Sequence, residues 1–137
     1  MPLIFHTGPL LAALDAADPD HEQSTRLLLG ANEDLVVPAL VLAEVDYWCH
    51  KRLGAEAWLV FLDDVLAGAY GIEAPTGNDL RRSRELQADY ADLGLGVVDA
   101  SVIALAERLG ETRIATLDHR HFTVVRPQHV HAFELVP

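Results

Sequence analysis

Short apolar runs alternate with longer segments of helical periodicity along the whole chain. The runs predict buried strands at residues 3–5, 35–37, 70–74, 113–117 and 131–136. Apolar positions at helical spacing predict helices at residues 10–15, 19–30, 39–53, 55–67, 78–90 and 99–110. Strands that alternate with helices across short loops predict an α/β fold, with a central, mostly parallel sheet flanked by helices on both faces.

The composition agrees with one globular domain that spans residues 1–137. Half of the residues are hydrophobic and 23% are charged, which excludes a disordered chain. The single cysteine, Cys49, excludes an intrachain disulfide and gives no sign of an oxidising compartment. The N-terminus has no signal-peptide pattern, and no run of 18 apolar residues occurs. We therefore expect a cytoplasmic protein that does not contact a membrane.

The charge balance is strongly acidic. The chain contains ten Lys and Arg residues and 21 Asp and Glu residues, so its formal net charge is −11. A protein that coats nucleic acid through bulk charge should be basic, so this function class is excluded. The clearest local groups of basic residues are Arg81, Arg82 and Arg84, which we interpret as a solvated helix face, and Arg120 with Arg126.

Four polar residues stand where an α/β fold places functional groups. His6 follows the first strand, Asp118 follows the strand at 113–117, and Asp99 begins the helix before that strand. Glu44 lies inside an apolar helical stretch, where a charge needs a reason. Sites in open α/β sheets form outside the carboxyl ends of the strands, so we expect several of these residues at one edge of the sheet.

Each residue also has a simpler interpretation. Asp99 is a good helix N-cap, and Asp118 could start a turn with His119 and Arg120. Glu44 could lie on the solvent edge of its helix, and a lone histidine such as His6 is more often a satisfied, partly buried side chain than a ligand.

Together the four side chains indicate a cation site. Clustered carboxylates repel one another and stay ionised only when a cation lies between them. Mg²⁺ and Mn²⁺ favour oxygen ligands and take one or two carboxylates each. Such an ion activates water and stabilises the leaving oxygen of a phosphodiester.

In these features the chain resembles the PIN-domain ribonucleases, and specifically the VapC toxins of VapBC toxin–antitoxin modules. The resemblance covers nearly the whole chain, in order and at the family's spacing. It is carried by residues 4–15, 37–45, 95–101 and 114–122.

The resemblance implies an endoribonuclease toxin that hydrolyses phosphodiester bonds of RNA, commonly tRNA or rRNA, with Mg²⁺ or Mn²⁺. Carried over to this sequence, Glu44, Asp99 and Asp118 are catalytic acids and metal ligands. Thr7 and Thr116 are supporting hydroxyls. The resemblance further implies a homodimer that a VapB-type antitoxin neutralises. Close to this site, Arg120 is a candidate contact to an RNA phosphate.

His6 departs from the family pattern, because the first metal ligand there is ordinarily an aspartate. Imidazole binds Mn²⁺ or Zn²⁺ but is a poor ligand for Mg²⁺, and it removes one negative charge. Three interpretations follow: a natural variant that prefers a softer metal, a pseudoenzyme that binds RNA or antitoxin without cutting, or an inactivating substitution. The alternative function is therefore a non-catalytic PIN-fold module that binds antitoxin or RNA.

Two further groups of residues are predicted to have structural roles. Aromatic and aliphatic side chains of the middle helices are expected in the core, with an antitoxin groove or a dimer contact as the alternative: Tyr47, Trp48, Trp58, Phe61, Leu62 and Leu66. The C-terminal histidines match no zinc site and are expected at the surface, with the first two near the site only in sequence: His119, His121, His129 and His131. A phosphoacceptor signalling domain is excluded, because it needs a late lysine and the only lysine is Lys51.

Overall fold

A computed structural model describes all residues, 1–137, and contains one five-stranded sheet in which every pair of neighbouring strands is parallel. The strand order is β3-β2-β1-β4-β5. The strands are β1 (Leu3–Phe5), β2 (Leu35–Pro38), β3 (Gly71–Glu73), β4 (Arg113–Ala115) and β5 (Glu134–Val136). The predicted α/β class and parallel sheet are confirmed.

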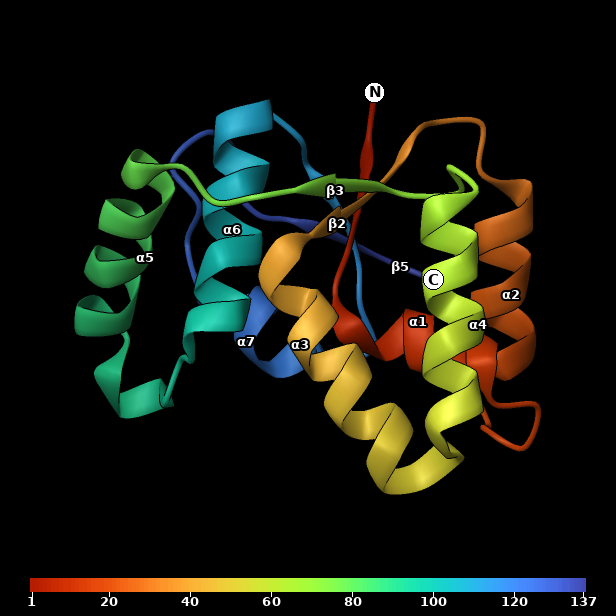
Figure 1. The fold of residues 1–137 in the computed structure, drawn as a ribbon. Helices are drawn as coiled ribbons and strands as arrows, with labels where there is room; N and C mark the ends of the chain where they lie inside the picture. The colour runs from red at the N-terminus through yellow and green to blue at the C-terminus, as the bar shows by residue number, and fades with distance from the viewer.

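Helices cover both faces of this sheet. The helices are α1 (Thr7–Leu14), α2 (His21–Gly30), α3 (Ala39–Trp48), α4 (Ala55–Leu66), α5 (Gly77–Asp89), α6 (Val97–Leu109) and α7 (His119–Val124). A π-helical turn, η1 (Cys49–Leu53), continues α3, and a 3₁₀ turn, η2 (Ala91–Leu93), follows α5. Helices α5 and α6 lie on one side of the sheet, and α1, α2 and α4 lie on the other (Figure 1).

The central strands read as continuous apolar runs because helices bury both of their faces. Leu3, Ile4 and Phe5 of β1 are fully buried, as is Ile114 of β4. A strand with one wet face would alternate apolar and polar residues instead. The core around β1 therefore fixes where the first strand ends, and with it the position of His6.

The predicted elements are present, but several boundaries differ: the helix predicted at 10–15 begins at Thr7, and the strand predicted at 131–136 begins at Glu134. The helix expected at 39–53 is α helix only to Trp48 and π helix beyond it. The helix expected to begin at Asp99 begins at Val97, because Gly96 takes the extended N-cap conformation. The turn expected at Asp118 opens the short helix α7, which Asp118 caps.

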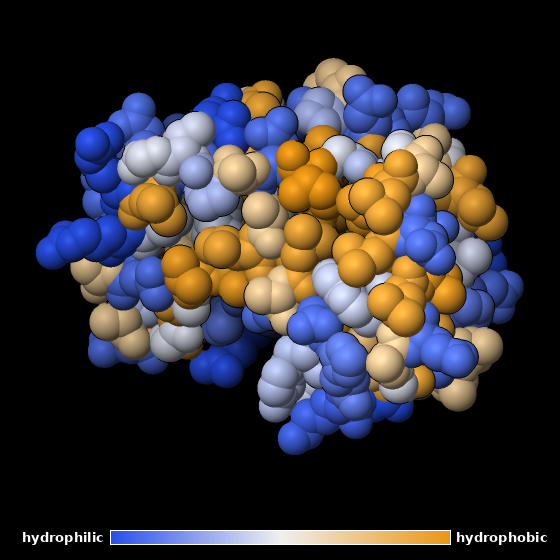
Figure 2. Space-filling model, in the orientation of Figure 1, coloured by the Kyte–Doolittle hydropathy of each residue, from blue (hydrophilic) through white to orange (hydrophobic).

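The aromatic side chains of the middle helices divide between core and surface. Phe61 is buried, whereas Tyr47 and Leu66 are exposed. Exposed apolar side chains form a band across the face that α3, β3 and α4 present (Figure 2). Core packing, the favoured interpretation, therefore holds for Phe61 and not for these two residues.

No helix in the structure has the length and apolar character required to cross a membrane.

Candidate active site

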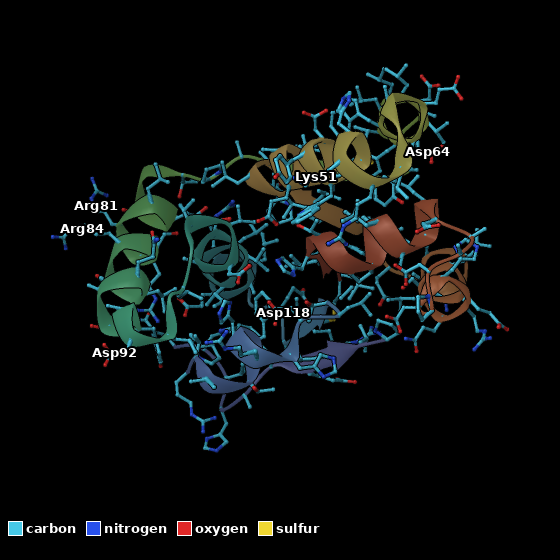
Figure 3. The ribbon with its side chains drawn as sticks, turned by 90° about the horizontal axis from the view of Figure 1, so that it is seen from below. Lys51, Asp64, Arg81, Arg84, Asp92 and Asp118 are labelled. Carbon is cyan, nitrogen blue, oxygen red and sulfur yellow. The ribbon has the colours of Figure 1, made fainter.

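The predicted site residues converge at the carboxyl ends of the central strands. His6 directly follows β1, and Asp118 follows β4 by three residues. Strands β1 and β4 are neighbours, but the chain runs outward from them in opposite directions, toward β2 and toward β5. This is the topological switch point, where open α/β sheets leave a crevice for ligands. Figure 3 looks onto this end of the molecule, with Asp118 near its middle.

Asp99 lies at the centre of the cluster, in the first turn of α6. Oδ1 of Asp99 is 2.8 Å from Nε2 of His6, and Oδ2 is 2.5 Å from Nδ1 of His121. Burial alone would raise the pKa of this carboxyl, but contact with the two imidazoles outweighs burial and lowers the pKa. The N-cap interpretation of Asp99 is wrong: Gly96 is the N-cap, and the Asp99 carboxylate is held between the two imidazoles.

His6 is 7% exposed and is not a satisfied core histidine. Its Nδ1 is hydrogen-bonded to Oγ1 of Thr116 at 3.0 Å. Its Nε2 is buried and has no partner in hydrogen-bonding geometry, although Asp99 is 2.8 Å away and Oε1 of Glu44 is 3.9 Å away. The ring is therefore anchored on one side and presents its other nitrogen to two carboxylates.

Glu44 faces the cluster from α3, and its side chain is 37% exposed. The Thr7 hydroxyl donates a hydrogen bond of 2.5 Å to Oε1 of Glu44, and so orients this carboxylate. Glu44 therefore lies at the solvent edge of its helix, as the simpler interpretation held, and also points toward His6. Both predicted supporting hydroxyls, Thr7 and Thr116, contact residues of the cluster.

Asp118 combines a capping role with a place beside the cluster. Its Oδ1 accepts a hydrogen bond of 3.1 Å from the Arg120 amide and caps α7. Its Oδ2 is 3.9 Å from Nδ1 of His121. The Arg120 side chain is exposed and makes no ion pair within the chain.

His121 belongs to the cluster, although the sequence predicts it at the surface. Its side chain is 16% exposed and contacts Asp99. The signal in the sequence is its position three residues after Asp118, which puts both residues on one side of a helical turn. Predicting a turn in place of a helix at Asp118 hides this signal. His119, on the same short helix, is exposed as expected.

The cluster has a donor set that suits a divalent cation. One ligand atom from each of Asp99, Asp118 and His121 lies within 4.8 Å of the others. Nε2 of His6 and the Glu44 carboxylate extend this set toward α3. Three carboxylates and two imidazoles are ligands that Mn²⁺, Co²⁺ and Zn²⁺ accept, and the carboxylates alone suit Mg²⁺.

The basic residues of α5 lie away from the cluster of His6, Glu44, Asp99, Asp118 and His121. Arg81 and Arg84 point outward from α5, away from Asp118 (Figure 3). Arg82 instead forms ion pairs with Glu107 and Glu85. The interpretation of Arg81 and Arg84 as a solvated helix face agrees with this placement.

Comparison with known proteins gives a consistent family assignment. Residues 4–126 match the PIN domain. The chain is 33% identical over 135 residues to ribonuclease VapC26 of Mycobacterium tuberculosis, a match that covers 98% of this chain and all of the relative.

Solved structures share the fold. VapC20 of Mycobacterium tuberculosis, a toxin that cleaves the sarcin–ricin loop, matches with a TM-score of 0.82 at 20% identity, over 93% of this chain and 98% of that chain. A toxin–antitoxin complex from Klebsiella pneumoniae matches with a TM-score of 0.65 at 17% identity, over 90% of this chain and 92% of that chain. Relatives of this fold have thus been crystallised with their antitoxins.

Proposed function

Because the chain belongs to the PIN-domain family and is a homologue of the VapC ribonucleases, we propose that it is a metal-dependent endoribonuclease toxin neutralised by a cognate antitoxin. The whole chain, residues 1–137, acts as one PIN domain. The observation that carries the proposal is the convergence of His6, Glu44, Asp99 and Asp118 at the switch point of the sheet.

In this proposal the carboxylates of the cluster hold a divalent cation, Mg²⁺ or Mn²⁺, and orient the attacking water. When bound, the cation neutralises charge on the scissile phosphodiester and lowers the pKa of water to the range where hydroxide forms. Asp99 serves as an ionised ligand, since its contacts with His6 and His121 keep its pKa low. Glu44, oriented by Thr7, is exposed enough to meet water or substrate.

The position of His6 supports the interpretation of a working variant. Thr116 anchors the ring, and Nε2 faces Asp99 and Glu44 rather than packing into the core. The pseudoenzyme and the inactivating substitution are nevertheless distinct outcomes of the experiment described below.

The substrate of the proposed enzyme is a structured RNA, tRNA or rRNA. VapC20, which shares the fold, cleaves the sarcin–ricin loop. The net charge of −11 argues against RNA binding through bulk charge, so the contacts must be local. Arg120 fits this role because its side chain is exposed and free of ion pairs, two residues from Asp118.

The proposed partners are a VapB-type antitoxin and a second copy of the chain. An apolar hollow of about 330 Å³ lies between α1, α2 and α4, and it suits the apolar face of an antitoxin helix. Its lining includes Leu10, Leu14, Leu28 and Phe61. The acidic surface would attract basic residues of such a segment. The exposed band over α3 and α4 is the proposed homodimer contact.

RNA cleavage by three forms of the protein tests this function. Total tRNA and rRNA are incubated with Mg²⁺ or Mn²⁺ and the unaltered chain, Asp99→Ala or His6→Asp. We expect the unaltered chain to cleave RNA with Mn²⁺ and Asp99→Ala to lose at least about 10²-fold in rate, the scale of losing one charged catalytic group. Cleavage by His6→Asp alone would identify His6 as inactivating. No cleavage by any form would leave the non-catalytic binding module as the function.

A further inference from the structure

The contacts around His6 fix the orientation of its ring. Oγ1 of Thr116 accepts a hydrogen bond of 3.0 Å from the Asp118 amide and lies 3.0 Å from Nδ1 of His6. The ring is therefore held at Nδ1, and Nε2 is the nitrogen that faces the carboxylates of Asp99 and Glu44.

This orientation places two potential metal ligands close together inside the protein. Nε2 of His6 lies 2.8 Å from Oδ1 of Asp99 and is buried without a partner in hydrogen-bonding geometry. Ligands at about 2.1 Å from one ion in octahedral geometry lie about 3.0 Å apart. The pair therefore has the spacing of two adjacent ligands of one cation.

His121 supplies a second nitrogen on the opposite side of Asp99. Nδ1 of His121 is 2.5 Å from Oδ2 of Asp99, and its side chain is largely buried. It belongs to the group in which ligand atoms of Asp99, Asp118 and His121 all lie within 4.8 Å. The nitrogen character of the cluster therefore comes from two imidazoles, on two different elements of the fold.

We propose that His6 and His121 make this site selective for a transition-metal ion that accepts imidazole ligands, with Co²⁺ and Zn²⁺ bound more tightly than Mn²⁺, and Mg²⁺ bound most weakly. The inference rests on the proposed function only in placing the metal at this cluster. Mg²⁺ prefers oxygen ligands and retains its waters, whereas the affinity of a mixed nitrogen and oxygen site rises from Mn²⁺ toward Co²⁺. Thr116 acts as the positioning residue that fixes the orientation of the His6 ring.

Metal binding to the metal-free full chain, measured without RNA, tests this proposal. Titration calorimetry with Co²⁺, Mn²⁺ and Mg²⁺ gives the affinities, and the absorption of bound Co²⁺ reports its ligands. We expect Co²⁺ to bind at least about tenfold more tightly than Mg²⁺. A Mg²⁺ affinity equal to or above that of Co²⁺ would overturn the proposal.

Single substitutions separate the two imidazoles. His6→Asp should strengthen Mg²⁺ binding and weaken Co²⁺ binding, and His121→Ala should weaken Co²⁺ binding by about tenfold or more with little effect on Mg²⁺. His119→Ala is the matched control, because His119 is exposed on the same helix. Equal Co²⁺ selectivity in His6→Asp, His121→Ala and the unaltered chain would contradict the assignment.

A spectroscopic test uses the unaltered chain and so does not depend on whether a variant folds. Pulsed electron paramagnetic resonance of the unaltered chain with Mn²⁺ should show couplings to imidazole nitrogen, and their absence would overturn the proposal. If the chain cleaves RNA but does not prefer Co²⁺ over Mg²⁺, the metal-selectivity proposal is wrong and the proposed function is unaffected. If the chain prefers Co²⁺ but cleaves no RNA, the metal-selectivity proposal is supported and the proposed ribonuclease function is wrong.

Discussion

Two imidazole rings contact the Asp99 carboxylate, one at each oxygen. Without them, a carboxylate this deeply placed would be driven toward its neutral form, but His6 and His121 lower its pKa. The ionised state of Asp99 is thus set by its neighbours.

The sequence predicted the individual site residues better than it predicted their contacts. Strand ends identify His6 and Asp118, and the charge inside an apolar helix identifies Glu44. No pattern in the sequence shows that His121 turns inward, because α7 has only six residues and too few apolar positions to show a periodicity. The orientation of the His6 ring follows from its contact with Thr116, which no pattern in the sequence shows.

Replacing Thr116 by valine tests the positioning of His6. Valine keeps the shape and removes the hydroxyl, so His6 Nδ1 and the Asp118 amide lose their partner. We expect Mn²⁺ and Co²⁺ affinity to fall by about 10–100-fold, as for other residues that orient a metal ligand. Calorimetry gives the affinities, and thermal unfolding shows that the variant is folded.

Thr123→Val is the control for this substitution. Thr123 is exposed on α7, and its hydroxyl bonds only to the backbone carbonyls of His119 and Arg120. The Thr123→Val variant should bind metal with the same affinity as the unaltered chain. Unchanged metal affinity in Thr116→Val would show that the hydroxyl does not position the ring.

At the scale of elements, the apolar periodicity predicted which helices and strands exist better than it predicted the residues at which they begin and end. The start of α6 lies two residues before the predicted one because Gly96, without a polar side chain, forms the N-cap through its backbone conformation. The π-helical turn η1 has the same apolar spacing as the α helix it extends, so the sequence does not distinguish the two. The short loops and the buried apolar runs of the sequence were enough to predict the remaining helices and strands.

The segment between α4 and β3 holds a partly buried tyrosine. The Tyr70 ring packs against Phe61 of α4 and Phe5 of β1, at centroid distances of 5.3 and 6.4 Å. Burial, with a smaller contribution from the negative charge of Asp64, raises the pKa of Tyr70 to about 12. Ionising this side chain in the folded protein therefore costs free energy.

This packing predicts a loss of stability at alkaline pH. The unfolded chain releases the Tyr70 proton near pH 10.0, whereas the folded chain keeps it until about pH 12. The folded state binds more protons in this window, so its stability falls as pH rises from about 10 to about 12. The urea midpoint of the unaltered chain should therefore fall more than that of Tyr70→Phe.

Tyr47→Phe provides the comparison, because Tyr47 is 53% exposed. Its urea midpoint should follow that of the unaltered chain across the same pH window. If Tyr70→Phe loses as much stability as the unaltered chain does, the burial of Tyr70 does not govern the alkaline transition.

At the scale of the molecule, the sheet order decides where the chemistry lies. Alternating strands and helices predict a parallel sheet, but they do not show that β1 and β4 are neighbours. That adjacency creates the switch point and brings His6 beside Thr116, 110 positions away in sequence. The net charge of −11 excluded coating of nucleic acid but did not locate the local site.

The most direct test of the central claim, that the cluster is the metal centre of this PIN-domain protein, is crystallographic. Crystals grown with Mn²⁺ should give an anomalous difference peak among the ligand atoms of His6, Asp99, Asp118 and His121. The same data from Asp99→Asn should lack the peak. A strong peak elsewhere in the chain, or an equal peak in Asp99→Asn, would contradict this assignment of the metal centre.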